Sequence, residues 1–405
     1  MSSKPTVRFL DRTTPPHLFT LIFTAAMSSL AMNMFLPSLP SISEYFNTEY
    51  RVMQLALTLY LGTSGLLQII IGPMSDRFGR RNVLIGGFVI FSFASLGCVF
   101  AQSAEVFLVF RVLQASIAVA MVLARAIVRD MVPQDQAASM LGYITMFIAI
   151  SPMISPAIGG FIDEAFGWRA IFWSLFIAGL IAIALIWADL GETNRHRSSS
   201  FSQQFSEYPE LLTSHRFWGY CGSAAFATGA FFAYLGGAPF IGVEVFGLSP
   251  SKLGFFLGAP ALGYILGNFI TGRYSMRFGA NRMVLVGATI GGFGSMIPLV
   301  LFNLGFGTPV TFFGSVTLVG LGNGMVLPNA TAGMLSVRPH LAGTASGLGG
   351  ALMTGGGGAL ASLAGVMLVP GSGPYPLLWI MMTTSSLSVV SIIWVILRQR
   401  QVGIT

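Results

Sequence analysis

The sequence predicts an all-α integral membrane protein with twelve transmembrane helices in two pseudo-symmetric six-helix halves. Three observations support this fold class. Hydrophobic residues make up 54% of the chain and charged residues only 9%, with a mean hydropathy of +0.76, whereas soluble domains carry about 25% charged residues. The apolar residues gather in runs long enough to cross a bilayer. One short charged loop occurs twice, between such runs.

Each apolar run is bounded by charged residues or by Gly and Pro turns, and each approaches the roughly 20 residues that a spanning helix needs. The runs predict twelve helices, at 18–40, 51–73, 82–101, 104–129, 135–162, 168–188, 214–242, 249–272, 282–303, 308–332, 341–369 and 374–398. The longest polar segment follows the sixth run. We therefore predict an N-terminal half at 1–188, a cytoplasmic linker at 189–213 and a C-terminal half at 214–405.

Lys and Arg residues are distributed unequally between the loops. Twelve spans place both termini on the same side, and that side holds nearly all the basic residues outside the spans. The opposite side receives only Arg51, Arg169 and Lys252. Because loops rich in Lys and Arg remain in the cytoplasm, we predict a multi-pass protein of the cell (inner) membrane with both termini cytoplasmic. The net charge of +7 then reflects topology in a lipid bilayer, and no nucleic-acid partner is expected.

The repeated loop has one chemical difference between its copies. Gly72–Arg81 reads GPMSDRFGRR, and Gly272–Arg282 reads GRYSMRFGANR, with Met276 in the place of Asp76. Basic residues alone are enough to set membrane topology, so Asp76 predicts an additional function for the first loop. At a helix end, Asp76 can accept hydrogen bonds from Arg side chains or backbone groups. We expect a conformational gate here; the alternative is that these charges set topology alone.

The inner end of the fourth predicted span carries Arg125, Arg129 and Asp130. The two arginines are four residues apart and share a helix face. We expect Asp130 to pair with Arg77 or Arg81 across the inner mouth. The alternative is a solvated helix end without such a pair.

Arg111 lies inside the fourth predicted span, and Gln114 follows three residues later on the same helix face. A charge at membrane depth costs several kcal/mol and is retained for a reason. We expect Arg111 to face a cavity, where it binds an anionic or polar substrate or repels a proton site. The alternative is an arginine near the outer end that extends its head group to the membrane interface.

The fifth predicted span contains the sequence SPMISPAIGG at 151–160. Pro152 and Pro156, about one turn apart, predict a kink. Gly159 and Gly160 predict the close approach of a neighbouring helix. The eleventh span is also rich in glycine and occupies the equivalent place in the second half, so we expect these two spans to pair with each other.

Together these motifs resemble the major facilitator superfamily. The first loop resembles the signature G-x-x-x-D-R-x-G-R-R of that superfamily, with Gly72, Asp76, Arg77, Gly79, Arg80 and Arg81 at the matching places. The pair Arg111 and Gln114 resembles the R-x-x-Q element of the proton-coupled exporters, and the fifth span resembles the motif that marks antiporters. Residues 36–40 and 125–130 are similar to those of the Bcr/CflA branch, the bicyclomycin and chloramphenicol resistance exporters.

The resemblance implies a secondary active transporter that exports small amphipathic or drug-like molecules by alternating access, in exchange for protons. It also implies that the first and fourth helices of each half line the cavity. Asn33, Arg111, Gln114, Asn323 and Asn329 are therefore the expected substrate-binding or coupling residues, although buried amides more often connect helices. The expected cytoplasmic gate comprises Gly72, Asp76, Arg77, Gly79, Arg80, Arg81, Arg125, Arg129 and Asp130, and the expected antiporter-motif residues are Pro152, Pro156, Gly159 and Gly160.

One residue departs from the branch pattern. Asn33 stands four places before the first Pro of the L-P-x-L-P element, where the branch commonly carries an acid, and Asn cannot titrate. An alternative function is therefore a small-metabolite or organic-anion carrier, working as a uniporter or symporter without drug specificity. Arg111 favours an anion, because no predicted span has an acid at its middle.

The sequence gives no indication of an enzyme. It contains no phosphate-binding loop and no metal-ligand spacing, and Cys98 and Cys221 lie singly in apolar runs. We expect neither cofactor nor metal. The expected partners are a small-molecule substrate, the proton gradient and the lipid bilayer, and the expected state is a monomer.

Overall fold

A computed structural model describes residues 7–131, 134–194, 211–338 and 342–401. The described part of the chain contains helices and no β-strand, which confirms the all-α fold class. The first half comprises α1 (Leu18–Asn33), η1 (Leu36–Ser38), α2 (Leu39–Tyr45), α3 (Tyr50–Met53), α4 (Leu55–Phe78), α5 (Arg80–Phe100), α6 (Ala104–Gln114), η2 (Ala115–Ile117), α7 (Ala118–Met131), α8 (Gln134–Phe166) and α9 (Arg169–Asp189). The second comprises α12 (His215–Phe240), η3 (Ile241–Val245), α13 (Pro250–Leu257), α14 (Ala259–Phe278), α15 (Ala280–Asn303), α16 (Pro309–Ser336), α17 (Ala342–Met367) and α18 (Tyr375–Gln401).

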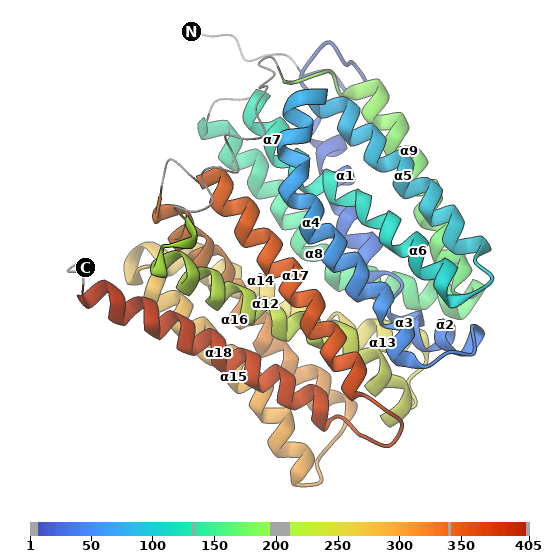
Figure 1. Ribbon diagram of the computed structural model, residues 1–405, viewed down its shortest axis with the longest axis vertical. Helices are drawn as coiled ribbons and strands as arrows, with labels where there is room; N and C mark the ends of the chain where they lie inside the picture. Colours follow the sequence, from blue (N-terminus) through green and yellow to red (C-terminus); the bar gives the residue numbers. More distant parts are fainter. Residues whose placement is uncertain (1–6, 132–133, 195–210, 339–341, 402–405) are drawn as a thin grey trace.

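These elements form two helical bundles, drawn in blue to teal and in green to red in Figure 1. Among the described residues, 11 helices are long and apolar enough to cross a membrane, and they coincide with eleven of the predicted spans. The remaining predicted span, 135–162, coincides with α8, several of whose side chains lie outside the described residues. The chain is therefore a multi-pass membrane protein. The predicted limits of the two halves stay a prediction.

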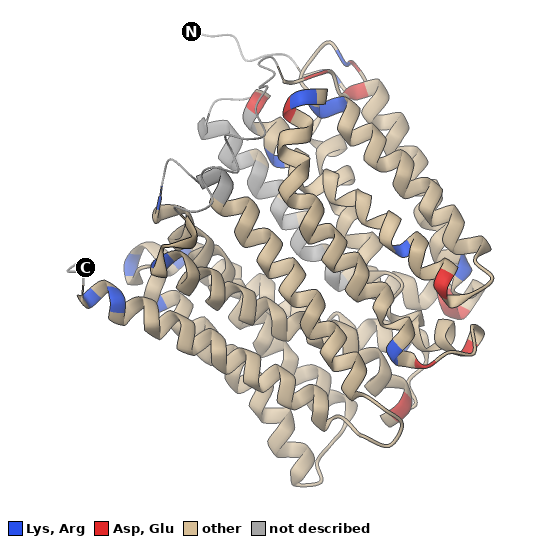
Figure 2. Ribbon diagram, viewed as in Figure 1, with Lys and Arg blue, Asp and Glu red and all other residues tan. Residues whose placement is uncertain are grey.

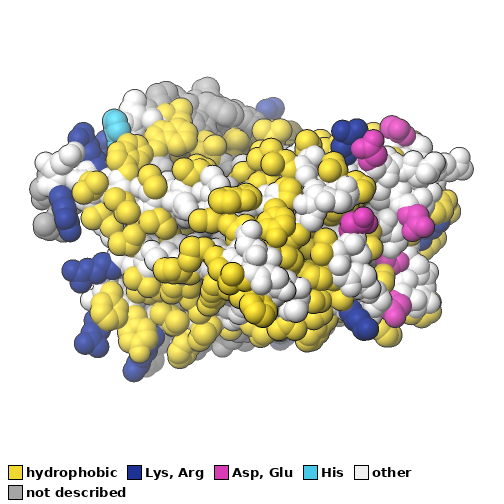
Figure 3. All heavy atoms as spheres, turned by 90° about the horizontal axis from the view of Figure 1, so that it is seen from below, with side chains coloured by type: hydrophobic (Ala, Val, Ile, Leu, Met, Phe, Trp, Pro, Cys, Tyr) yellow, Lys and Arg dark blue, Asp and Glu magenta, His cyan; other side chains and the backbone are white. Residues whose placement is uncertain are grey.

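Charged side chains gather at opposite ends of the molecule, with an apolar belt between them (Figures 2 and 3). The basic end contains the turn between α4 and α5 and the end of α14, with Arg77, Arg81, Arg273 and Arg277. The acidic end contains the ends of α2 and α8, the start of α6 and the turn η3, with Glu44, Glu164, Glu105 and Glu244. Such a separation follows from the cost of placing charge in hydrocarbon, because the membrane-spanning helices expose only their ends to water.

The two halves share one hydrophobic core near the acidic end. Phe35, Leu36 and Leu39 of the first half belong to the same buried cluster as Leu253 and Leu257 of the second. A second cluster lies toward the basic end and contains only residues of the second half, among them Phe217, Tyr220, Met334 and Val395. Apolar packing between the halves is therefore concentrated at the acidic end.

Three helix pairs join the halves: α4 packs on α17, and α8 packs on both α13 and α14. The expected pairing of the fifth span with the eleventh is thus wrong, since each of these helices packs on a helix of the other half that is not its equivalent. Glycines explain the choice. A Cβ atom at Gly160 would lie 2.2 Å from the carbonyl oxygen of Pro250, and one at Gly254 would lie 2.3 Å from that of Pro156. Only helices with facing glycines approach so closely.

The same principle holds inside the second half. A Cβ atom at Gly320 in α16 would lie 1.7 Å from the carbonyl oxygen of Pro260 in α14, whereas Gly314, also in α16, has no neighbour within 4 Å. We expect Gly320→Val to force α14 and α16 apart and to destabilise the protein by about 1–3 kcal/mol. Thermal unfolding of the purified protein in detergent measures this effect. The matched control is Gly314→Val, and equal unfolding midpoints for the two variants would contradict the packing argument.

Candidate functional site

Arg111 is completely buried, with 0% of its surface exposed. It lies near the end of α6, just before the 3-10 turn η2 that separates α6 from α7. Its Nη1 atom donates hydrogen bonds to the Gln114 side chain and to the Ala31 carbonyl oxygen, the latter at 3.4 Å. The guanidinium lies over the rings of Phe35 and Tyr60, with Cζ 3.9 Å and 4.9 Å from the ring centroids. The side chain therefore points into the first bundle and does not reach the membrane interface.

The guanidinium of Arg111 is only partly satisfied. Its Nε and Nη2 atoms have no hydrogen-bond partner among the described residues. No carboxylate of the described chain forms an ion pair with it. The two aromatic faces stabilise the positive charge, but unpaired N–H donors remain costly in a dry environment. Arg111 thus keeps two donor atoms for which the described residues provide no acceptor.

Gln114 holds Arg111 in position. Its Oε1 atom accepts from Arg111, and its Nε2 atom donates to Ser95 Oγ of α5 at 2.7 Å. Ser95 in turn donates to the Phe91 carbonyl oxygen at 2.8 Å. This chain of hydrogen bonds fixes the amide orientation and connects Arg111 to α5. Sequence reasoning did not identify Ser95, because one small polar residue in an apolar span carries no distinctive signal.

Asn33, the last residue of α1, is also buried. Its Nδ2 atom donates to the Ser29 carbonyl oxygen at 2.8 Å, and its Oδ1 atom has no partner among the described residues. Asn33 follows Ala31, whose carbonyl Arg111 contacts, by two residues. The structure therefore brings Arg111 and Gln114 into one polar region inside the first half, while no hydrogen bond among the described residues joins Asn33 to either side chain. This region, with Phe35 and Tyr60, is called the arginine site below.

Asn323 and Asn329 do not join the arginine site, since both lie in α16 of the second half. Asn329 donates to the Met325 carbonyl oxygen at 2.8 Å and to Thr271 Oγ1 at 3.3 Å, and it accepts from Ser275 Oγ at 2.5 Å. These bonds connect α16 to α14, so Asn329 has the role of connecting helices that is common for buried amides. Asn323 lines a small cavity within the second half, together with Ser385 and Ser388 of α18.

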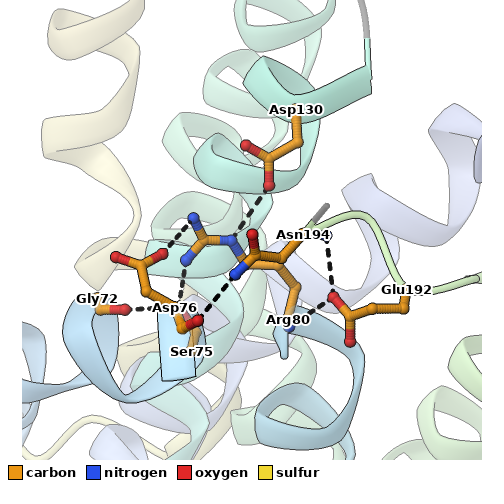
Figure 4. Close-up of polar contacts among 7 residues, drawn as sticks. All are labelled: Gly72, Ser75, Asp76, Arg80, Asp130, Glu192 and Asn194. Atoms are coloured by element: carbon orange, nitrogen blue, oxygen red, sulfur yellow. Dashed lines mark hydrogen bonds and ion pairs between the residues drawn. The ribbon is translucent and has the colours of Figure 1, made fainter. Parts of the chain in front are cut away.

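The loop of the first repeat is organised around Arg80 (Figure 4). Its guanidinium contacts Asp76 Oδ1 at 2.6 Å, Asp130 Oδ2 at 3.2 Å and the hydroxyl of Ser75. Ser75 itself donates to the Gly72 carbonyl oxygen at 2.8 Å. Gly79 makes the turn between α4 and α5 with φ of +93°, a conformation that suits glycine. One arginine thereby connects α4, α5 and α7 where they meet at the basic end.

Among the described residues, the predicted gate residues Arg77, Arg81 and Arg125 form no ion pair with this cluster. Asp130 pairs with Arg80, so the expected pairing with Arg77 or Arg81 is wrong. The turn at Gly79 directs Arg80 back toward α4 and α7, while its neighbours face outward. Arg77 is exposed and lies over the Phe78 ring at 5.4 Å, and Arg81 donates to the Trp187 carbonyl oxygen at 3.1 Å. Arg125 is exposed on α7, and the Arg129 side chain lies outside the described residues.

Two further residues complete the cluster, and sequence reasoning assigned both to the linker. Glu192 Oε1 accepts from the Arg80 backbone N–H at 2.9 Å and from that of Asn194 at 3.0 Å. The Asn194 side chain donates to the Asp76 carbonyl oxygen at 3.0 Å. Glu192 thus places a negative charge at the N-terminus of α5, where the helix dipole favours it. A Cβ atom at residue 79 would lie 2.2 Å from Glu192 Oε2, so Gly79 also leaves room for this carboxylate.

The antiporter-motif residues of α8 serve two helix contacts. A Cβ atom at Gly159 would lie 1.7 Å from the Met34 carbonyl oxygen, next to Asn33, while Gly160 faces Pro250 of the second half. Pro156 contributes the carbonyl oxygen that Gly254 approaches. The Pro152 side chain lies outside the described residues. The motif therefore connects the end of α1 to the interface between the halves.

Comparison with known proteins agrees with these features. Residues 21–362 match the family model described as Major Facilitator Superfamily. A chloramphenicol resistance protein of Pseudomonas aeruginosa is 31% identical over 335 residues, covering 81% of this chain and 79% of that protein. A bicyclomycin resistance protein homolog of Haemophilus influenzae is 27% identical over 369 residues, covering 88% and 90%. A solved structure of the peptide transporter POT in complex with sulfate has a TM-score of 0.78 at 14% identity, covering 96% of this chain and 95% of that one, which shows a shared fold. The resemblance inferred from the sequence motifs is confirmed.

The Arg80 cluster makes a testable contribution to stability. We expect Arg80→Gln to leave Asp76 and Asp130 without their common partner and to cost about 1.5–3 kcal/mol, the range for a hydrogen bond to a charged group. Thermal unfolding in detergent measures the loss. Arg77→Gln removes the same charge from an exposed position in the same loop and should change the midpoint little. If both variants unfold at the wild-type temperature, the cluster does not hold the helix ends together.

Proposed function

This chain belongs to the major facilitator superfamily, and from that premise we propose that it exports small amphipathic or drug-like molecules in exchange for protons, by alternating access. The relatives whose names refer to chloramphenicol and bicyclomycin resistance support a drug-like substrate. The observation that carries the proposal is the arginine site. A completely buried guanidinium with two unpaired donor atoms supports a binding site for a polar group.

The conformation described here fits the state of an alternating-access cycle in which the acidic end is closed. At the acidic end, Tyr50 donates to the Gly236 carbonyl oxygen at 2.8 Å, and Gln54 donates to that of Ala361 at 2.6 Å, each across the two halves. Glu164 of α8 accepts from the Ser251 backbone N–H of α13 at 3.2 Å. These contacts and the shared core close the acidic end. Export requires them to break, so that a bound molecule can leave on that side.

We assign the basic end to the cytoplasm, because loops rich in Lys and Arg are retained there. Both termini are then cytoplasmic. The Arg80 cluster lies at this end within the first half, and we propose it as the cytoplasmic gate. By holding the ends of α4, α5 and α7 as one unit, it lets the half move as a rigid body against the second half.

Proton coupling requires a group that changes charge. Asn33 cannot supply it, and no carboxylate of the described chain contacts Arg111. We propose a carboxylate at a helix end as the proton carrier, with Asp76 and Asp130 as candidates because they share Arg80. The unpaired Arg111 also supports the second candidate function, an organic-anion carrier without proton coupling, because an anion would complete its coordination.

Inside-out vesicles with an imposed proton gradient and a pH dye test the leading function. We expect a neutral or cationic drug-like compound to dissipate the gradient in vesicles with the wild-type protein. The effect should disappear in Arg111→Gln, because the amide cannot replace the buried charge, and it should persist in Arg51→Gln, an exposed arginine at the acidic end. Movement of a labelled organic anion without any proton movement would instead support the uncoupled carrier.

A second prediction concerns Asn33. We expect Asn33→Asp to introduce a titratable group beside the arginine site and to steepen the dependence of transport on pH. Initial rates of export, measured across a series of internal pH values, provide the test. Asn303→Asp adds the same group at the acidic end of α15 and serves as the control. A pH profile of Asn33→Asp identical to that of the wild type would count against a coupling role for this position.

A further inference from the structure

Residues 7–17, called the N-terminal strap, are fixed against the end of α9 by one buried carboxylate. Asp189 Oδ1 accepts from the Leu10 backbone N–H and Oδ2 from that of His17, both at 2.8 Å. The strap also passes close to the chain that leaves α9, since a Cβ atom at Gly191 would lie 2.4 Å from the Arg12 carbonyl oxygen. The strap is therefore an ordered part of the first half at the basic end.

The strap exposes three apolar side chains beside its exposed Arg8 and Arg12. Val7, Phe9 and Leu10 are large hydrophobic residues with about half of their surface exposed. The Phe9 ring packs against Phe19, an exposed residue in the first turn of α1, with centroids 6.2 Å apart. Exposed apolar side chains beside the ends of membrane-spanning helices suit the interfacial layer of a bilayer, where the acyl chains meet the head groups.

Two arginines meet at one exposed tryptophan beside the strap. Trp187, in the last turn of α9, is 59% exposed. The Arg12 guanidinium of the strap lies 5.4 Å from its ring centroid, and Arg81 of α5 donates to its carbonyl oxygen at 3.1 Å. Figure 1 shows α5 and α9 running side by side, in agreement with their packing contacts. Three separate segments of the chain thus place two arginines at Trp187, and these three residues are called the basic cluster below.

The described residues around the basic cluster do not neutralise its positive charge. Neither Arg12 nor Arg81 forms an ion pair there, and Arg81 Nε has no hydrogen-bond partner. The nearby acids are engaged elsewhere. Asp189 holds the strap, and Glu192 caps α5. Hydrogen bonds from Thr13 and, less strongly, the positive charge of Arg8 lower the pKa of Asp11.

We propose that Arg12, Arg81 and Trp187 bind the phosphate of an anionic phospholipid in the leaflet at the basic end. Guanidinium groups match the geometry of phosphate oxygens, and tryptophan is enriched at the level of the head groups. Basic pockets between helices on this side of a membrane are suited to anionic head groups. The exposed apolar side chains of the strap favour a lipid over free phosphate, because they would contact the acyl chains of the same molecule. This inference is independent of the transported substrate.

Binding of an anionic phospholipid at the basic cluster would have a structural consequence. The lipid would connect the strap, α5 and α9, and α5 begins with Arg80, the centre of the proposed gate. Anionic lipid should therefore stabilise the inner end of the first half. A phosphate group held by two arginines also gives a binding strength that falls as salt concentration rises.

The test compares the full-length protein in nanodiscs of phosphatidylcholine alone and of phosphatidylcholine with phosphatidylglycerol. We expect phosphatidylglycerol to raise the unfolding temperature of the wild type, and high salt to reduce the rise. Arg12→Gln should lose part of the rise, and Arg12→Gln with Arg81→Gln should lose most of it. Arg273→Gln, which removes an exposed arginine from the basic end of the second half, should keep the full rise.

Two results would overturn the proposal. One is an equal rise in all four proteins, which would mean that the lipid acts through general charge. The other is an equal rise of the wild type in detergent with inorganic phosphate alone, which would mean that no lipid is required. If the double variant does not fold, Arg12→Gln still decides the question, because Arg12 is exposed and its loss should not disturb the core.

Discussion

The hydrocarbon core of a membrane excludes unpaired charge, and the arrangement of this protein follows from that constraint. The chain places its charged residues at the ends of its helices and keeps Arg111 at depth, where α1, α4, α5 and α6 converge on it. The Ala31 carbonyl, the rings of Phe35 and Tyr60 and the amide of Gln114 hold its guanidinium. These groups satisfy part of its bonding capacity, and two of its donor atoms remain without a partner among the described residues.

The two halves repeat the same backbone and differ in chemistry. Gly79 and Gly279 make equivalent turns with φ of +93° and +81°. In the first half the turn leads into a charged cluster of Arg80 with two aspartates. In the second half, neutral hydrogen bonds take its place: Ser275 with Asn329 at 2.5 Å, and Tyr220 with the Asn281 side chain at 2.6 Å. The charged cluster at this turn is therefore a feature of the first half, and neutral hydrogen bonds occupy the equivalent place in the second.

The sequence was sufficient for features that depend on local pattern. Hydropathy located the spans, the repeated loop revealed the two halves, and spacing placed Gln114 beside Arg111. Contacts between segments far apart in the chain could not be predicted from the sequence. Nothing in the residues near Glu192 shows that the chain folds back to cap α5, and the partner of Asp130 depends on how the turn at Gly79 directs Arg80. The pairing of α8 was wrong for a similar reason, since the facing glycine, Gly254, lies in another half.

The proposed cycle requires the contacts between the two halves at the acidic end to break while the basic ends of the two halves approach each other. Double electron–electron resonance in proteoliposomes tests it most directly, with one pair of spin labels on Glu105→Cys and Lys252→Cys at the acidic end and another on Asn82→Cys and Met276→Cys at the basic end. All four positions are exposed, and the native Cys98 and Cys221 are buried. The account predicts that an exported compound together with a proton gradient lengthens the first distance and shortens the second. Distances that stay unchanged, or that change in the same direction, would contradict it.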